Sequence, residues 1–326
     1  MMFDSGKSAG TTLSFDAASV SYQGARSYQE DSVLCSFPIG HPLGFSVIAD
    51  GIGGHVSGHV ASALATTEVY SQLKMNEAAL TAGSQSIPAT LQNAANQANE
   101  RIAAHTAADD ETTGMGSTLL VTVVKGDKLH WLSIGDSPLL LFRGGALRLL
   151  NKDHSMAPQI DMMVKMGSMT PEVGRDHPDR NTLVSVVDGN EIAMVDCPTA
   201  PLSLLPDDII IAASDGLQYL PNATLANVLM LSKDGRSADI ANALLGALQQ
   251  LDHPEQDNTA FCVIKFGDMR QAPNELHAED IPVLAVADSV ETPQAPAAAT
   301  APDPAAAEAE REKKAYWYRG QKYYKD

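Results

Sequence analysis

The chain has 326 residues, 44% of them apolar, which is enough for a substantial core in one large domain or two average ones. Its 22 basic and 40 acidic residues give a formal charge of −18, so binding to nucleic acid is not expected. The three cysteines, Cys35, Cys197 and Cys262, form no C-x-x-C pair, which suits a reducing compartment. The N-terminus lacks a signal-peptide pattern and no apolar stretch approaches the roughly 20 residues of a membrane span, so we expect a cytoplasmic protein that is not transmembrane.

The N-terminal part of the chain predicts strands followed by helices. Strand-like alternation occurs at 15–22, 31–37 and 43–50. The short turn Pro38–Pro42 favours antiparallel pairing of the second and third of these strands. Helical spacing then predicts one helix over Val56–Leu73 and a second from Pro88 to about His105, with Pro88 in its first turn.

Strands return in the second half of the chain. Residues 117–136 and 137–150 are apolar and strand-like, with Gly-Asp and Gly-Gly hairpin signals inside them. Residues 152–190 show little periodicity and indicate a short helix plus an irregular loop. Strands at 209–215 and 260–266 bracket a helical stretch from about Thr224 to Leu251. Strands and helices that occur in runs, rather than in strict alternation, favour an α+β fold.

Composition changes after about Asp268. We expect a catalytic domain over 1–268, an acidic, disordered Pro/Ala-rich linker over 269–309 and a basic, aromatic tail over 310–326. The tail holds much aromatic surface for a disordered segment, so it is a possible docking motif. A protein partner, the acidic body of the same chain and an anionic membrane surface are all open as its target, as is a tail that is merely solvated.

The most informative residues are aspartates that stand where an apolar strand gives way to a turn. These are Asp50 before Gly51, Asp215 before Gly216 and Asp257 before Asn258. Strand ends hold side chains rigidly, and a neighbouring glycine allows close approach of backbone or ligand. Each motif alone is more often an ordinary turn. Three carboxylates from distant strands nevertheless make a plausible cage for Mg²⁺ or Mn²⁺.

The order of the motifs along the chain is more specific than any one of them. The chain contains GARSYQED (24–31), ADGIGGH (49–55), GSTLL (116–120), IGDS (134–137), KDHS (152–155), HPDRN (177–181), ASDGL (213–217) and DNTA (257–260). This succession, over roughly residues 15–267, resembles the PPM family (type 2C) of metal-dependent Ser/Thr protein phosphatases, especially its bacterial members. The resemblance implies an α+β fold: a four-layer α-β-β-α sandwich with two mainly antiparallel central sheets.

The resemblance also implies a set of metal ligands. Asp50 is similar to the carboxylate that bridges two metal ions, and the Gly51 carbonyl would bind one of them. Asp215 and Asp257 would complete the second metal site. Asp136 in IGDS resembles an aspartate that helps to hold a third ion in bacterial members, although Gly-Asp also makes ordinary hairpin turns. The implied cofactors are two or three Mn²⁺ or Mg²⁺ ions.

Three further residues have implied roles around these ions. Arg26 matches the family's phosphate-binding, catalytic arginine, and its planar fork suits bidentate contact with phosphate. Glu30 and Asp31 resemble groups outside the metal ligands that orient metal-bound waters. Two cations roughly 3.5–4 Å apart would yield hydroxide at neutral pH, which would attack phosphorus in line without a covalent intermediate. The partners implied are phosphoserine and phosphothreonine proteins, among them a cognate bacterial Ser/Thr kinase and the substrates of that kinase.

Two residues depart from the family pattern. Gln29 replaces the usual Asn before Glu-Asp, and Ile52 stands where some members have a candidate general-acid histidine. We interpret His55 as a structural residue. The segment 154–185 resembles the family's flap. Its first residue, His154, is a poor candidate for a metal ligand among hard-oxygen groups.

Other functions remain open from the residues alone. A catalytically silent phosphoprotein-binding scaffold of the same fold would usually lack one or more metal aspartates, and here Asp50, Asp215 and Asp257 are all present. A different metallohydrolase is also compatible with the site chemistry, since the assignment to protein phosphatases rests on family analogy.

Overall fold

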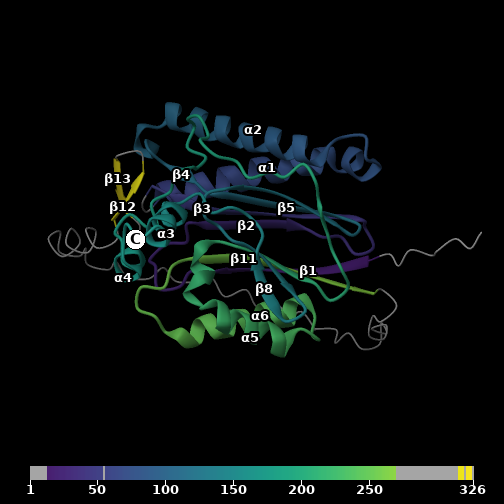
Figure 1. Cartoon of the computed structure of the whole chain (residues 1–326). Helices are drawn as coiled ribbons and strands as arrows, with labels where there is room; N and C mark the ends of the chain where they lie inside the picture. The colour runs from purple at the N-terminus through teal and green to yellow at the C-terminus, as the bar shows by residue number, and fades with distance from the viewer. Residues whose placement is uncertain (1–12, 54–55, 269–314, 319–320, 325–326) are drawn as a thin grey trace, which may run out of the picture.

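The computed structural model describes residues 13–53, 56–268, 315–318 and 321–324. Two stacked β-sheets form the middle of the molecule, and a pair of helices covers the outer face of each (Figure 1). This is the α-β-β-α sandwich that the sequence predicted. None of the helices in the described residues is both long and apolar enough to cross a bilayer.

The first sheet has the strand order β2-β3-β5-β6-β9, with β4 paired to β3, and all of these pairs are antiparallel. Its strands are β2 (Asp31–Ser36), β3 (Leu43–Ile52), β4 (Gly116–Ser117), β5 (Leu119–Lys125), β6 (Lys128–Ile134) and β9 (Leu202–Ser203). Helices α1 (Val56–Ala82) and α2 (Ile87–Ala108) cover it. The predicted pairing of the second and third strands is confirmed by the β2–β3 register.

The second sheet has the order β1-β11-β10-β7-β8 and is antiparallel throughout. Its strands are β1 (Leu13–Tyr22), β7 (Leu139–Arg143), β8 (Ala146–Leu149), β10 (Ile209–Ala213) and β11 (Thr259–Asp268). Helices α5 (Asn222–Ser232) and α6 (Ser237–Leu251) cover its outer face (Figure 1).

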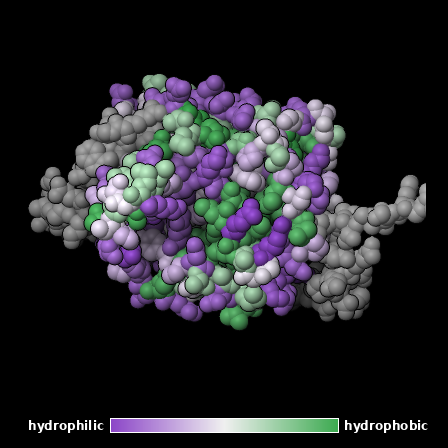
Figure 2. All heavy atoms as spheres, in the orientation of Figure 1, coloured by the Kyte–Doolittle hydropathy of each residue, from purple (hydrophilic) through white to green (hydrophobic). Residues whose placement is uncertain are grey.

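Three apolar layers hold the sandwich together, and strand alternation creates them. Along β3, Phe45 and Val47 pack against α1 and α2, whereas Ile48 points between the two sheets. Phe261 and Val263 of β11 pack toward α5 and α6. Because side chains alternate across a strand, each sheet contributes to two of these layers. The outer surface of the molecule over helices α1 and α2 is mainly hydrophilic, as the top edge of the molecule in Figure 2 shows.

The helices differ from the sequence expectations mainly at their ends. Helix α1 continues to Ala82, well beyond Leu73. Helix α2 begins after Ser86, whose hydroxyl accepts from the Ala89 amide, and Pro88 lies in its first turn as predicted.

The helical stretch expected from about Thr224 to Leu251 is helical in the structure, but it consists of two helices. Helix α5 ends at Ser232, and the chain turns through Gly235. The Asp239 carboxylate then accepts from the Arg236 amide at 2.9 Å and caps the start of α6.

Residues 152–190 hold two short helices, α3 (Ala157–Lys165) and α4 (Pro171–Arg175), where one was expected. In the predicted tail, β12 (Ala315–Tyr318) pairs antiparallel with β13 (Gln321–Tyr324). The predicted linker 269–309 lies outside the described residues, and the docking role of the tail stays a prediction.

Candidate active-site cleft and metal centre

An open cleft of about 640 Å³ lies at one end of the two sheets. The sequence-predicted residues that line it are Arg26, Asp50, Asp136, Asp215 and Asp257. Arg26 follows β1, Asp50 is near the end of β3, Asp136 lies between β6 and β7, Asp215 follows β10, and Asp257 precedes β11. Both sheets therefore contribute, and segments as far apart as 26 and 257 meet in one cleft.

The backbone of Asp50 is fixed by Ser117 of β4 and by Thr118, which lies between β4 and β5. Its amide donates to the Thr118 hydroxyl at 2.9 Å. Its carbonyl accepts from the Thr118 amide and from the Ser117 hydroxyl, each at 2.9 Å. The GSTLL motif thus holds Asp50 in position, a role that the sequence analysis did not assign to it.

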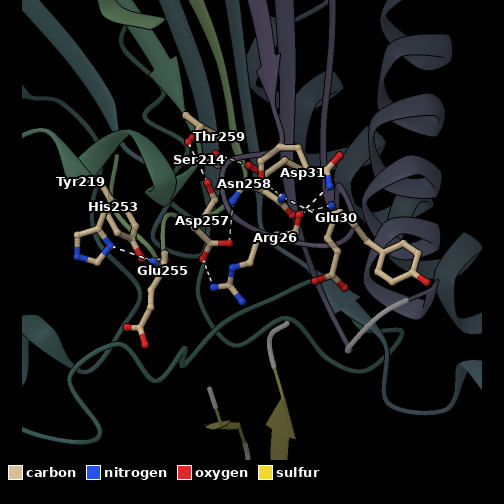
Figure 3. Close-up of polar contacts among 12 residues, drawn as sticks. Arg26, Glu30, Asp31, Ser214, Tyr219, His253, Glu255, Asp257, Asn258 and Thr259 are labelled. Atoms are coloured by element: carbon tan, nitrogen blue, oxygen red, sulfur yellow. Dashed lines mark hydrogen bonds and ion pairs between the residues drawn. The ribbon is translucent and has the colours of Figure 1, made fainter. Parts of the chain in front are cut away.

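Glu30 and Asp31 lie behind the cleft rather than on its lining. Both are buried, and Asp31 is the Cα partner of Asp50 across the β2–β3 pair. The Ser214 hydroxyl donates to Asp31 Oδ2 at 2.6 Å, which connects the two sheets beside the site (Figure 3). These positions are compatible with the predicted supporting roles, which stay predictions.

Asn258 is a site residue that the sequence analysis missed. Its side-chain oxygen accepts from the Glu30 amide at 2.8 Å (Figure 3). Its side-chain amide donates to the carbonyls of Gln23 and Tyr28, at 2.8 and 2.9 Å. Asn258 therefore ties the loop that carries Arg26 to the start of β11. The DNTA motif was the available signal, but only its aspartate was considered.

The glycines beside two of the aspartates are explained by close backbone approach. A Cβ on Gly51 would lie 2.1 Å from the Gly58 carbonyl oxygen in the first turns of α1. A Cβ on Gly216 would lie 1.9 Å from the Asn258 carbonyl oxygen. The Asp-Gly pairs thus allow neighbouring segments to pack directly against the site.

Arg26 and Asp257 form an ion pair in the cleft. Arg26 Nη2 donates to Asp257 Oδ2 at 2.8 Å, and the side chains are only 10% and 8% exposed (Figure 3). The other carboxylate oxygen of Asp257 accepts from the Asn258 amide at 2.8 Å. The predicted phosphate-binding cation and a predicted metal ligand therefore contact each other.

The donor set fits hard divalent cations. Five aspartates line the cleft: Asp50, Asp136, Asp153, Asp215 and Asp257. Carboxylate oxygens are the ligands that Mg²⁺ and Mn²⁺ prefer. Asp153 is a second residue that the sequence analysis missed, although it stands in the quoted KDHS motif.

The same carboxylates do not form a finished cage. Within the described ranges, no group of three His, Cys, Asp or Glu side chains is drawn together closely enough to hold an ion. Like-charged carboxylates repel one another, and Arg26 already neutralises part of the charge of Asp257. The ligand roles of Asp50, Gly51, Asp136, Asp215 and Asp257 stay predictions.

The residues that depart from the family pattern take defined places. The Gln29 side-chain oxygen accepts from the Asp31 amide at 3.0 Å, so the longer amide still makes a hydrogen bond. Ile52 lines the cleft and packs with Leu183 and Val186. His55 lies outside the described residues.

His154 has a structural role. Its Nδ1 accepts from the Gly135 amide at 3.3 Å, and its own amide donates to the Gly135 carbonyl at 3.1 Å. Burial lowers the pKa of His154, Asp196 and Asp153 oppose that shift, and Lys152 adds to it. The neutral ring thus anchors the start of the flap.

An arginine at the end of the flap connects it to the cleft. Arg180 lines the cleft and donates to both carboxylate oxygens of Asp161 on α3, at 2.8 and 3.3 Å. It also donates to the Gly174 carbonyl of α4 at 3.3 Å. Arg180 therefore holds the two short helices of the flap together beside the cleft.

Comparison with known proteins agrees with the fold and the motif order. The chain is 28% identical over 187 residues to the serine/threonine phosphatase stp of Listeria monocytogenes, across 57% of this chain and 71% of that protein. It is 29% identical over 215 residues to the serine/threonine protein phosphatase PstP of Mycobacterium tuberculosis, across 65% of this chain and 38% of PstP.

Solved structures extend the likeness over more of the chain. The crystal structure of PstP from M. tuberculosis superposes with a TM-score of 0.62 at 27% identity, over 78% of this chain and 99% of that one. The catalytic domain of PstP in complex with two manganese ions gives a TM-score of 0.61 at 27% identity, over 79% and 100%. The fold and family predicted from the sequence are both confirmed. Since the family model for protein phosphatase 2C matches residues 28–256, most of its length, this chain belongs to the protein phosphatase 2C family.

Proposed function

We propose that this chain is a metal-dependent phosphatase of phosphoserine and phosphothreonine proteins. One observation carries the proposal: Asp50, Asp136, Asp215 and Asp257 meet Arg26 in a single open cleft of a protein phosphatase 2C fold. Similarity to bacterial Ser/Thr phosphatases, one of them solved with two manganese ions, supports it.

The roles of the residues follow from their chemistry. Asp50, Asp215 and Asp257, with the Gly51 carbonyl, would hold two Mn²⁺ or Mg²⁺ ions, and Asp136 would help to hold a third. Bound ions supply an activated water and neutralise negative charge on the phosphoryl group. Without them, a cleft lined by carboxylates would repel a phosphate.

Arg26 would position the phosphoryl group. Its guanidinium lies at the cleft wall, where it pairs with Asp257. Once released from Asp257, this planar fork could donate two parallel hydrogen bonds to a phosphate. Glu30 and Asp31, buried behind the cleft, would accept hydrogen bonds from waters at the metal site.

The flap would bind the protein part of the substrate. Four exposed apolar residues lie on or next to α3 and α4, beside the cleft that Arg180 lines: Met162 and Met163 on α3, Met166 directly after it, and Val173 on α4. Such a surface suits a flexible segment around the phosphorylated residue. Substrates of a cognate bacterial Ser/Thr kinase in the cytoplasm are the partners that this chemistry suits best.

Hydrolysis of a phosphothreonine peptide by the purified full-length chain tests the proposal. Turnover should require Mn²⁺ or Mg²⁺, stop with a chelator, and be lost in Asp50→Asn and Asp257→Asn. Asp234→Asn is the matched control, because Asp234 is exposed in the α5–α6 turn and pairs with its chain neighbour Lys233. A folded, metal-loaded wild type without turnover would instead favour a silent phosphoprotein-binding scaffold.

The tail would act in partner binding rather than in chemistry. Its basic, aromatic sequence contrasts with the overall charge of −18. Deletion of 310–326 should leave hydrolysis of a small phosphate ester unchanged and weaken binding of a protein partner. Equal affinity with and without the tail would contradict this role.

A further inference from the structure

Two cysteines from different sheets meet in the apolar layer between the sheets. Cys35 lies on β2 of the first sheet, and Cys262 lies on β11 of the second. Both pack in the same core cluster, and their thiols hydrogen-bond each other. Cys262 is fully buried, whereas Cys35 is partly exposed at the edge of the layer.

Hydroxyl groups surround the two sulfur atoms. Ser19 is the Cα partner of Cys262 in the β1–β11 pair, and its Oγ lies 3.6 Å from Cys35 Sγ. Ser46 is the Cα partner of Cys35 in the β2–β3 pair, and its side chain hydrogen-bonds Cys262. Ser46 Oγ is also 2.6 Å from Thr122 Oγ1. An otherwise apolar layer therefore contains a polar cluster built around two thiols.

The two thiols differ in acidity because of this arrangement. The hydrogen bond from Cys262 lowers the pKa of Cys35 to about 6, burial opposes the shift, and the Ser19 hydroxyl adds to it. The pKa of Cys262 is raised well above its ordinary value, by the hydrogen bond to Cys35 and by burial. The arrangement thus favours the thiolate form at the partly exposed Cys35 and the thiol form at the buried Cys262, the combination found in redox-sensitive cysteines.

We propose that Cys35 and Cys262 form a reversible oxidation site that reacts with hydroperoxides and closes to a disulfide between the two sheets. In the first step the Cys35 sulfur attacks a peroxide oxygen, the O–O bond breaks, and Cys35 becomes a sulfenic acid. The other peroxide oxygen leaves as alkoxide, or as hydroxide from hydrogen peroxide, and takes up a proton. In the second step the Cys262 sulfur attacks the Cys35 sulfur, the S–O bond breaks, and the Cys262 proton leaves with the hydroxide as water. With hydrogen peroxide, two thiols become one disulfide and two waters form.

The sandwich architecture is compatible with such a bond. Immunoglobulin domains carry a disulfide between two packed sheets in the same kind of layer. The strands involved also lead to the candidate site, because Asp31 begins β2 and Asp257 stands two residues before the start of β11. Closing the bond would join these two strands at positions four residues beyond Asp31 and five residues beyond Asp257.

Peroxide treatment of the reduced full-length protein tests the site without reference to phosphatase activity. After treatment, free thiols are alkylated and the unreduced proteolytic peptides are identified by mass spectrometry. The expected product is a Cys35–Cys262 linked peptide that disappears with dithiothreitol. Cys197 is the internal control, because burial raises its pKa to about 11, and it should remain alkylatable.

Variants separate the two steps. Cys262→Ser, which keeps a hydrogen-bonding group beside Cys35, should leave a sulfenic acid on Cys35 that dimedone traps, and Cys197→Ser should form the linked peptide as the wild type does. Iodoacetamide should modify Cys35 at least ~10-fold faster than Cys197 at pH 7. Peroxide-treated wild type in which Cys35 and Cys262 both stay alkylatable, or in which Cys197 is oxidised first, would overturn the proposal.

Discussion

The Arg26 guanidinium donates to the Asp257 carboxylate at 2.8 Å, so the predicted phosphate-binding residue neutralises a predicted metal ligand. Asp257 Oδ2 cannot accept this hydrogen bond from Arg26 and bind a divalent cation equally well at the same time. Cation binding at Asp257 would therefore free the guanidinium fork for a phosphate, which couples the two binding events.

Replacing Arg26 by alanine tests that coupling. We expect KM for a phosphothreonine peptide to rise by roughly 10-fold or more, since a charge-assisted hydrogen bond is lost. The affinity for Mn²⁺, measured by calorimetry, should stay the same or increase, because the competitor of the metal at Asp257 is gone. Arg101→Ala, at an exposed position of α2, is the control. Weaker Mn²⁺ binding with an unchanged KM would contradict the coupling.

Gly51 gives a prediction about stability. A Cβ there would lie 2.1 Å from a backbone oxygen of Gly58, and backbone can shift only at a cost. Gly51→Ala should destabilise the protein by about 1–3 kcal/mol, as overpacking does. Gly246→Ala is the matched control: it lies in helix α6 with nothing within 4 Å of the added Cβ, so it should be neutral or stabilise by up to about 1 kcal/mol. Urea unfolding of the three proteins measures both values, and equal midpoints for the two variants would refute the steric argument.

Much of the fold could be predicted because the information is local. Alternation in 43–50 identifies β3, and Pro88 identifies the start of α2. The break at Gly235 was missed although the mainly polar run from Ser232 to Asp239 interrupts the apolar spacing there. The capping of the next helix by Asp239 becomes evident only once the turn has formed.

The contacts within the candidate site were harder to predict than the fold, because they are not local in the sequence. The aspartates were found because motif order along the chain carries them. The Arg26–Asp257 pair and the bridge made by Asn258 join segments more than 225 residues apart, and no local pattern encodes such contacts. In the same way, the Asp-Gly pairs predicted a close approach, but only the structure shows that the approaching group is neighbouring backbone.

His154 predicts how stability depends on pH. Its pKa is lowered by burial from an ordinary value of 6.5, so between that value and the folded pKa the unfolded chain binds more protons. The contribution of the neutral His154 ring to the free energy of unfolding is fully present above about pH 6.5, and it is lost as the pH falls toward the pKa of His154 in the folded protein. Urea midpoints at pH 7.5 and 5.5 should therefore fall less in His154→Asn than in the wild type. His130, whose pKa burial and Lys125 also lower, keeps its own contribution in the variant. An equal fall in both proteins would contradict the assignment.

The contact between Arg180 and Asp161 predicts that one substitution will change kcat/KM for a peptide substrate but not for a small phosphate ester. Asp161 is half exposed, so Asp161→Asn should change the free energy of unfolding by less than about 1 kcal/mol. The variant frees Arg180 from α3, however, and Arg180 lines the cleft beside the flap. We expect kcat/KM to fall several-fold for a phosphothreonine peptide and to stay nearly unchanged for a small phosphate ester that does not reach the flap. Glu172→Gln, an exposed change on α4 of the same flap, removes the same charge without releasing Arg180 and should affect neither substrate. A parallel loss for both substrates would mean that Arg180 acts on the phosphoryl group itself and that the flap contact is incidental.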